Sequence, residues 1–67
     1  MHINTVRGNF LFKEWDNNGW QKFDKQIQQL KENGYMKIDH EHDHLNYYEY
    51  YHKEGEQEVV VVTMMCI

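Results

Sequence analysis

The segment GWQKFDKQIQQLKEN, residues 19–33, decides how the rest of this chain can fold. Its apolar residues are spaced 3, 4 and 3 positions apart, which places them on one face of a helix: Trp20, Phe23, Ile27 and Leu30. Capping side chains precede the segment at residues 16–18, and Gly34 after it can take the left-handed conformation that ends helices. The pattern predicts a helix over residues 19–33 with a single apolar face.

Strand patterns lie on both sides of this helix. The aromatic-rich residues 9–15 predict a short strand, and residues 35–40 alternate, with Met36 and Ile38 on one side. Further along, Glu54 and Gly55 separate a tyrosine run from a valine run at the spacing of a two-residue hairpin. The order strand, helix, strand, strand, strand predicts one α+β domain over residues 1–67. The helix is expected to pack on one face of a mainly antiparallel sheet of three to four strands.

The predicted two-residue turn determines which hairpin side chains share a face. It places Tyr50 opposite Val59 and Tyr48 opposite Val61, on a face that we expect to be core. The other face combines two valines with residues typical of a half-exposed surface: Tyr47, Glu49, Tyr51 and Glu58. Because the helix can cover only one side of the sheet, this second face is expected to meet water or a partner.

Charge is unevenly divided along the chain, whose net charge is −4. Residues 1–38 carry six cationic and four acidic side chains, whereas residues 39–67 carry seven acidic side chains and one lysine. A nucleic-acid backbone is repelled by this second half, so direct nucleic-acid binding is not expected. A basic protein surface is attracted to it.

The length and the apolar segments bear on oligomeric state and location. A chain of 67 residues buries only about 60% of its unfolded surface, so a dimer interface would add useful stability. The valines of residues 59–62 are an aggregation hazard at a sheet edge, so we expect either a central strand or cover from a second subunit. Homodimerisation through this strand or through the uncovered face is therefore expected.

Cysteine and hydropathy patterns favour a cytoplasmic location without membrane contact. Cys66 is the sole cysteine, and no secretory signal pattern is present. The longest apolar segment is nine residues, far below the roughly 20 that a membrane-spanning helix needs.

The histidines offer the sharpest local chemistry. A continuous strand would project three imidazoles to one face, close enough to share a metal: His40, His42 and His44. Their alternation with Glu41 and Asp43 also suits a solvated connection between strands. A metal-binding or pH-responsive module that uses these histidines is therefore an alternative function, and no cofactor is expected.

The chain has no serine and no catalytic constellation, so enzymatic activity is not expected. A small histidine-dependent ribonuclease, of the kind built on one helix and a three-stranded sheet, is the remaining enzymatic alternative.

The sequence favours a protein-binding function. The run YYEYYHKEG, residues 47–55, is similar to a tyrosine-rich stretch of phage-encoded uracil-DNA glycosylase inhibitors, although the similarity spans nine of 67 residues and assigns no residue role. The most specific expectation is a phage or mobile-element inhibitor that occupies the basic nucleic-acid-binding surface of a host enzyme, such as a nuclease, a repair enzyme or a CRISPR effector. Tyrosine anchors and acidic side chains would contact that surface. The expected contact residues are Tyr47, Glu49, Tyr51, Glu54, Glu56 and Glu58.

Overall fold

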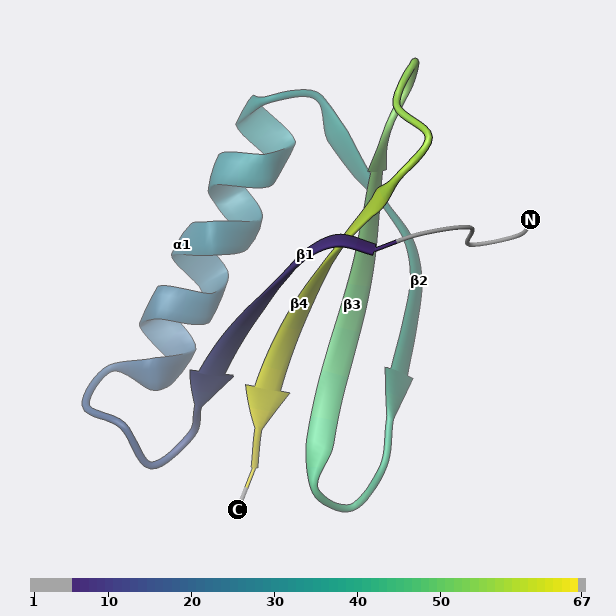
Figure 1. Cartoon of the computed structure of the whole chain (residues 1–67). Helices are drawn as coiled ribbons and strands as arrows, with labels where there is room; N and C mark the ends of the chain where they lie inside the picture. Colours follow the sequence, from purple (N-terminus) through teal and green to yellow (C-terminus); the bar gives the residue numbers. More distant parts are fainter. Residues whose placement is uncertain (1–5, 67) are drawn as a thin grey trace.

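Four strands and one helix follow one another along the chain in the predicted order. The computed structural model describes residues 6–66, and residues 1–5 and 67 of the predicted domain lie outside the described part. The elements are β1 (Val6–Lys13), α1 (Gly19–Glu32), β2 (Tyr35–His42), β3 (Asn46–Lys53) and β4 (Val59–Met65). One helix packed on a four-stranded, mainly antiparallel sheet confirms the predicted α+β class (Figure 1).

The sheet places β4 in its interior. The strand order is β1-β4-β3-β2, in which β4 pairs parallel with β1 and antiparallel with β3. The valine-rich strand therefore has a neighbour along both of its edges, which is the first of the two arrangements expected for it, a central strand. The two edges of the described sheet belong to β1 and β2 (Figure 1).

The start of α1 is fixed by close packing rather than by a capping side chain. Asn18 occupies the N-cap position with a left-handed φ of 62°, and its side chain makes no capping hydrogen bond. Gly19 follows it and is buried against the end of β1, where a Cβ atom would lie 2.1 Å from the carbonyl oxygen of Lys13. At the other end, Gly34 has a φ of 90° and leads directly into β2, as its position predicted.

The core lies between α1 and one face of the sheet. Phe23 and Leu30 of the helix are buried against alternate residues of β4, namely Val60, Val62 and Met64. Aromatic rings extend this core, since the Phe23 ring lies 6.3 Å from that of Phe12 and 6.0 Å from that of Tyr47. Trp20 belongs to the predicted apolar face but is 42% exposed, with its ring packed edge-on against Phe23.

The β3–β4 connection differs from the predicted two-residue turn. Strand β3 ends at Lys53 and β4 begins at Val59, so five residues connect them. The Glu56 N–H donates to the Lys53 carbonyl oxygen at 3.0 Å, and Gly55 at the third turn position has a φ of 92°. A positive φ at this position is typical of a type II turn, whose twist does not continue a hairpin ladder. The register is accordingly shifted, and Tyr50 pairs with Val61 instead of Val59.

The shift amounts to two residues on β4, so it preserves which hairpin side chains share a face. The prediction of which face meets the helix is nevertheless wrong. Tyr51 is 1% exposed and Glu49 is 9% exposed, because both lie beneath α1 together with the partly buried Tyr47. Tyr48 and Tyr50, expected in the core, lie on the face opposite the helix.

We predict that Leu30→Ala lowers the free energy of unfolding by about 2–5 kcal/mol, because it leaves a cavity where the helix packs on β4. Urea denaturation measures the change. Leu45→Ala is the matched control, since Leu45 is exposed between β2 and β3 and its truncation should have little effect. Equal losses for the two variants would contradict this description of the core.

We also predict that Gly19→Ala is destabilising by about 1–3 kcal/mol, although alanine ordinarily favours helices. The added methyl group would clash with the Lys13 carbonyl oxygen. Gly8→Ala is the control, because a Cβ atom at Gly8 has no neighbour within 4 Å. Thermal unfolding measures the stability of both variants. If Gly19→Ala were as stable as Gly8→Ala, the close approach of Gly19 to the Lys13 carbonyl oxygen would be unimportant.

Candidate functional site

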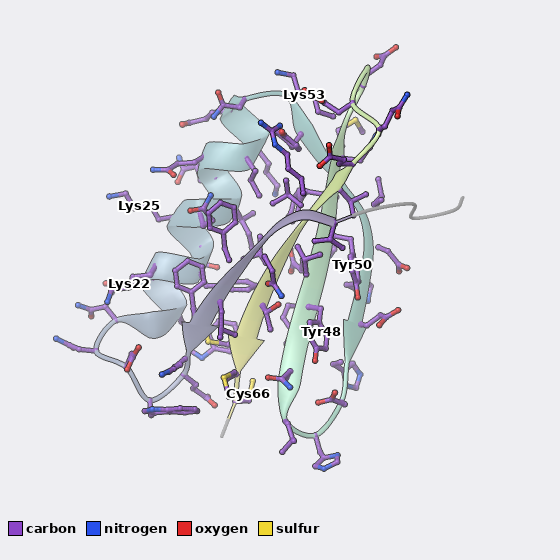
Figure 2. All side chains as sticks on the ribbon, in the orientation of Figure 1. Lys22, Lys25, Tyr48, Tyr50, Lys53 and Cys66 are labelled. Atoms are coloured by element: carbon purple, nitrogen blue, oxygen red, sulfur yellow. The ribbon has the colours of Figure 1, made fainter. Side chains whose placement is uncertain are left out.

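The sheet face opposite α1 is the main surface that the helix leaves uncovered, and we call it the open face. Strand pairing and alternation assign to it one row of residues from each strand. In the order of the strands in the sheet, these rows are Asn9 and Leu11 on β1; Val59, Val61 and Thr63 on β4; Tyr48, Tyr50 and His52 on β3; and Met36, Asp39 and Glu41 on β2. Figure 2 labels Tyr48 and Tyr50 on β3, and it shows Lys22 and Lys25 projecting from α1 away from the sheet.

The middle of the open face is lined by short, buried side chains. Val59, Val61 and Thr63 of β4 are buried although the helix lies on the other side of the sheet. Larger side chains flank this row, since Tyr50 pairs with Val61 and Tyr48 with Thr63. The Thr63 hydroxyl donates to the Asn9 side-chain oxygen at 2.8 Å, which satisfies its polar group. The open face thus presents half-buried aromatic rings beside a row of small side chains.

Acidic groups lie beside these tyrosines. Asp39 pairs with Tyr50, and Glu41 pairs with Tyr48. The Tyr50 hydroxyl donates to Glu41 Oε2 at 3.3 Å. Burial, together with the charge of Glu41, raises the pKa of Tyr50, so this hydroxyl stays protonated and remains a donor at neutral pH. Two tyrosines and two carboxylates therefore share one side of the open face.

The loops at both ends of the sheet extend the acidic surface. Glu54, Glu56 and Glu58, three of the expected contact residues, are exposed in the β3–β4 loop. Glu56 lies 3.9 Å from Arg7, but both side chains are about half exposed, so this ion pair is weak. At the opposite end, Asp43 accepts hydrogen bonds from the backbone N–H groups of Leu45 and Asn46, which lower its pKa.

The other predicted contact residues form a buried hydrogen-bonded cluster on the helix side of β3. Glu49 accepts the Tyr47 hydroxyl at 2.5 Å through one carboxylate oxygen and the Tyr51 hydroxyl at 2.6 Å through the other. Lys37 on β2 lies 3.8 Å from the same carboxylate. These contacts explain how a carboxylate is accommodated under the helix. The spacing Tyr-x-Glu-x-Tyr was the available signal, because it places both hydroxyls beside one carboxylate on a strand.

Protonation of this cluster is set by burial and by its hydrogen bonds. Burial raises the pKa of the Glu49 carboxyl, but the two tyrosine donors and the charges of nearby lysines outweigh burial, so the pKa is lower than usual. Burial and the bond to Glu49 raise the pKa of Tyr47 to about 12, and the same causes raise the pKa of Tyr51. The cluster therefore holds one negative charge and two protonated hydroxyls at neutral pH. Glu49 and Tyr51 of this cluster are buried beneath the helix rather than exposed to a partner.

The three histidines of the metal-site alternative do not converge. His40 and His42 lie on β2, paired with Glu49 and Tyr47 on the helix side of the sheet, whereas His44 lies in the connection to β3. Within residues 6–66, no group of three histidine, cysteine, aspartate or glutamate side chains is arranged to hold a metal ion. The geometry thus gives this alternative no support.

A separate hollow lies on the helix side of β1. It has a volume of about 320 Å³ and is mostly apolar, lined by Arg7, Gly8, Phe10, Leu30, Tyr35 and Val60. The Arg7 guanidinium donates to the Tyr35 hydroxyl at 3.1 Å, close to the exposed Glu56. Because Gly8 has no side chain, one wall of the hollow is bare backbone.

We predict that Glu49→Gln lowers the free energy of unfolding by about 1–3 kcal/mol at neutral pH, because two tyrosine hydroxyls lose a charged acceptor. The folded-state pKa of Glu49 lies below its ordinary value of 4.5. Its contribution to stability is therefore present above that value and is lost as pH falls through the folded-state pKa. The free energies of unfolding of wild type and variant should therefore differ at neutral pH and converge at about pH 3, as urea unfolding at both pH values would measure.

Glu32→Gln is the matched control, because Glu32 is exposed at the end of α1. It should change stability little at either pH. An equal loss for both variants, or a Glu49→Gln effect that is the same in acid, would rule out the buried carboxylate as the cause.

Comparisons with known proteins leave the site to be interpreted from its own geometry. No protein-family model, curated protein or solved structure matches this chain. Within the described part of the chain, no helix has the length and apolar character that crossing a membrane requires. The open face, with Tyr48, Tyr50, Asp39 and Glu41, is the surface on which a functional interpretation rests.

Proposed function

We propose that this protein is a binding module whose open face docks on the basic, nucleic-acid-binding surface of another protein. The observation that carries this proposal is the pairing of tyrosines with carboxylates on the face that α1 leaves uncovered. Tyr48 and Tyr50 lie beside Asp39 and Glu41, and Tyr50 is hydrogen-bonded to Glu41. This combination provides apolar contact area and negative charge within one surface.

The tyrosines supply the contact energy in this proposal. Tyrosine is enriched at protein interfaces because its large ring is apolar and its hydroxyl remains able to bind polar groups. Tyr48 and Tyr50 are half-buried, so their rings are already held by neighbouring side chains before a partner arrives. Little side-chain freedom is then lost on binding, which favours affinity.

The carboxylates supply electrostatic steering toward a basic partner surface. Asp39 and Glu41 flank the tyrosines, and the exposed glutamates of the β3–β4 loop add charge at one end of the sheet. A surface of this sign accelerates association with a basic partner and repels nucleic acid. Glu54, Glu56 and Glu58 therefore keep their proposed role as contact residues, and Tyr48 and Tyr50 take the role first given to Tyr47 and Tyr51.

Occupying such a surface has a defined biochemical consequence. Nucleic acid and this protein would compete for the same cationic side chains of the partner, so binding would inhibit the partner's action on nucleic acid. In its most specific form, the proposal is a phage or mobile-element inhibitor of a host nuclease, repair enzyme or CRISPR effector. The local similarity of residues 47–55 to uracil-DNA glycosylase inhibitors is in keeping with this class, although it assigns no residue role.

We predict that a protein captured by the immobilised chain from its source lysate is released by duplex DNA and by added salt. The double variant Tyr48→Ala/Tyr50→Ala should weaken binding at least tenfold, because it removes both anchors. Glu41→Gln should slow association and reduce its salt dependence. Surface plasmon resonance with the purified partner measures both rates.

Charge-matched and fold-matched controls accompany these variants. Glu32→Gln removes the same charge from the outside of α1 and should leave binding unchanged, and circular dichroism should show that every variant is folded. The proposal fails if duplex DNA does not compete with the captured protein. It also fails if the tyrosine double variant binds as well as wild type, or if the association rate is indifferent to salt.

A further inference from the structure

The two edges of the sheet are protected to very different extents. An exposed edge strand presents unpaired backbone groups that can pair with another chain, and soluble proteins usually block it with charges, proline or a bulge. Here the edges are β1 and β2. On β2 this protection lies in the middle of the strand, whereas β1 has its register shift between Val6 and Gly8 and its charges at Arg7 and Lys13, near its two ends.

Strand β2 is interrupted and charged. Its pairing with β3 shifts between Lys37 and Asp39, which leaves Ile38 as an irregularity in the strand. The charged side chains Lys37, Asp39 and Glu41 alternate along it. Met36 is exposed on this edge, but the irregularity and the charges follow it directly. A second strand would meet both obstacles on β2.

Strand β1 has neither device along its central part. Residues 8–12, GNFLF, contain no charge and no proline, and their pairing with β4 is regular. Exposed large apolar side chains are concentrated here, with Val6 at 52%, Phe10 at 40% and Leu11 at 54%. Phe10 and Leu11 project to opposite faces, so apolar surface is exposed on both sides of this edge.

The hollow described above adjoins the same edge. Gly8 and Phe10 contribute to its lining from the helix side of β1. A Cβ atom at Gly8 would have no neighbour within 4 Å, so this part of the strand is unfilled. In paired sheets, a large side chain on a neighbouring strand can pack over a glycine, so a strand added beside β1 could fill the space at Gly8. Both faces of β1 thus lack the cover that an additional strand would provide.

The geometry points to a homodimer in which the β1 strands of two copies pair with each other antiparallel. A second copy is the occupant because it supplies an edge of the same apolar character, and because identical strands related by a two-fold axis pair antiparallel. The axis is then perpendicular to the sheet, so the two four-stranded sheets become one continuous sheet. Both open faces lie on the same side of it. The dimer interface follows the β1 edge, whereas the tyrosines and carboxylates proposed to bind the partner protein lie on β3, on β2 and in the β3–β4 loop.

Sedimentation equilibrium on the full chain tests this interface. From about 10 μM to about 1 mM the weight-average mass should rise from near that of the 8.3 kDa monomer towards twice that value. Leu11→Lys places a charge at the centre of the edge and should raise the dimer dissociation constant at least tenfold. Leu45→Lys is the matched control, because it makes the same change at an exposed leucine outside the strands.

A measurement on the wild-type chain does not depend on how the variants fold. In a mixture of isotope-labelled and unlabelled copies, nuclear Overhauser effects between copies should connect residues of β1 to one another. A monomer throughout the concentration range would overturn the inference. So would a dimer that Leu11→Lys and Leu45→Lys weaken equally, or contacts between copies that involve β2 or the tyrosines of β3 instead of β1.

Discussion

The single apolar stripe of α1 is the constraint on which the arrangement of this protein depends. Phe23 and Leu30 bury one face of β4, and the helix has no second apolar face with which to cover the other side of the sheet. Strand β4 lies inside the sheet, so its backbone is paired along both edges. What remains uncovered is then determined: one face of the sheet and the two outer strands. Both proposed interaction surfaces, the open face and the β1 edge, belong to these uncovered parts.

The helix-covered face shows how polar residues can form part of a small core. Glu49 lies where an apolar residue would ordinarily be expected, and it is accommodated because Tyr47 and Tyr51 each direct a hydroxyl at it. In the described part of the chain, every buried side-chain nitrogen or oxygen has a hydrogen-bond partner. The tyrosine rings meanwhile pack with Phe23 and its neighbours. One cluster therefore combines apolar packing with the hydrogen bonding of a buried charge.

Local patterns in the sequence were sufficient to predict the helix and the strands, but not the strand register, the face that the helix covers or the pairing of distant strands. The spacing of Phe23, Ile27 and Leu30 predicted the helix, and alternation predicted which hairpin residues share a face. The assignment of those faces failed because Tyr47, Glu49 and Tyr51 look like surface residues until their mutual hydrogen bonds are known. The register failed because Gly55 serves a different turn type. The parallel pairing of β1 with β4 joins residues about 50 positions apart, and no local pattern encodes it.

That parallel pairing also has a consequence for the order of folding. Strands β2 and β3 are adjacent in the chain and can form a hairpin as soon as both are synthesised, whereas β1 has no strand neighbour until β4 is present. Closing so long a loop costs entropy before any contact compensates for it, and such topologies fold slowly. During synthesis, the aromatic residues of β1 would wait longest for their neighbour in the sheet. This interval is when association with chaperones or with other nascent chains would compete with folding.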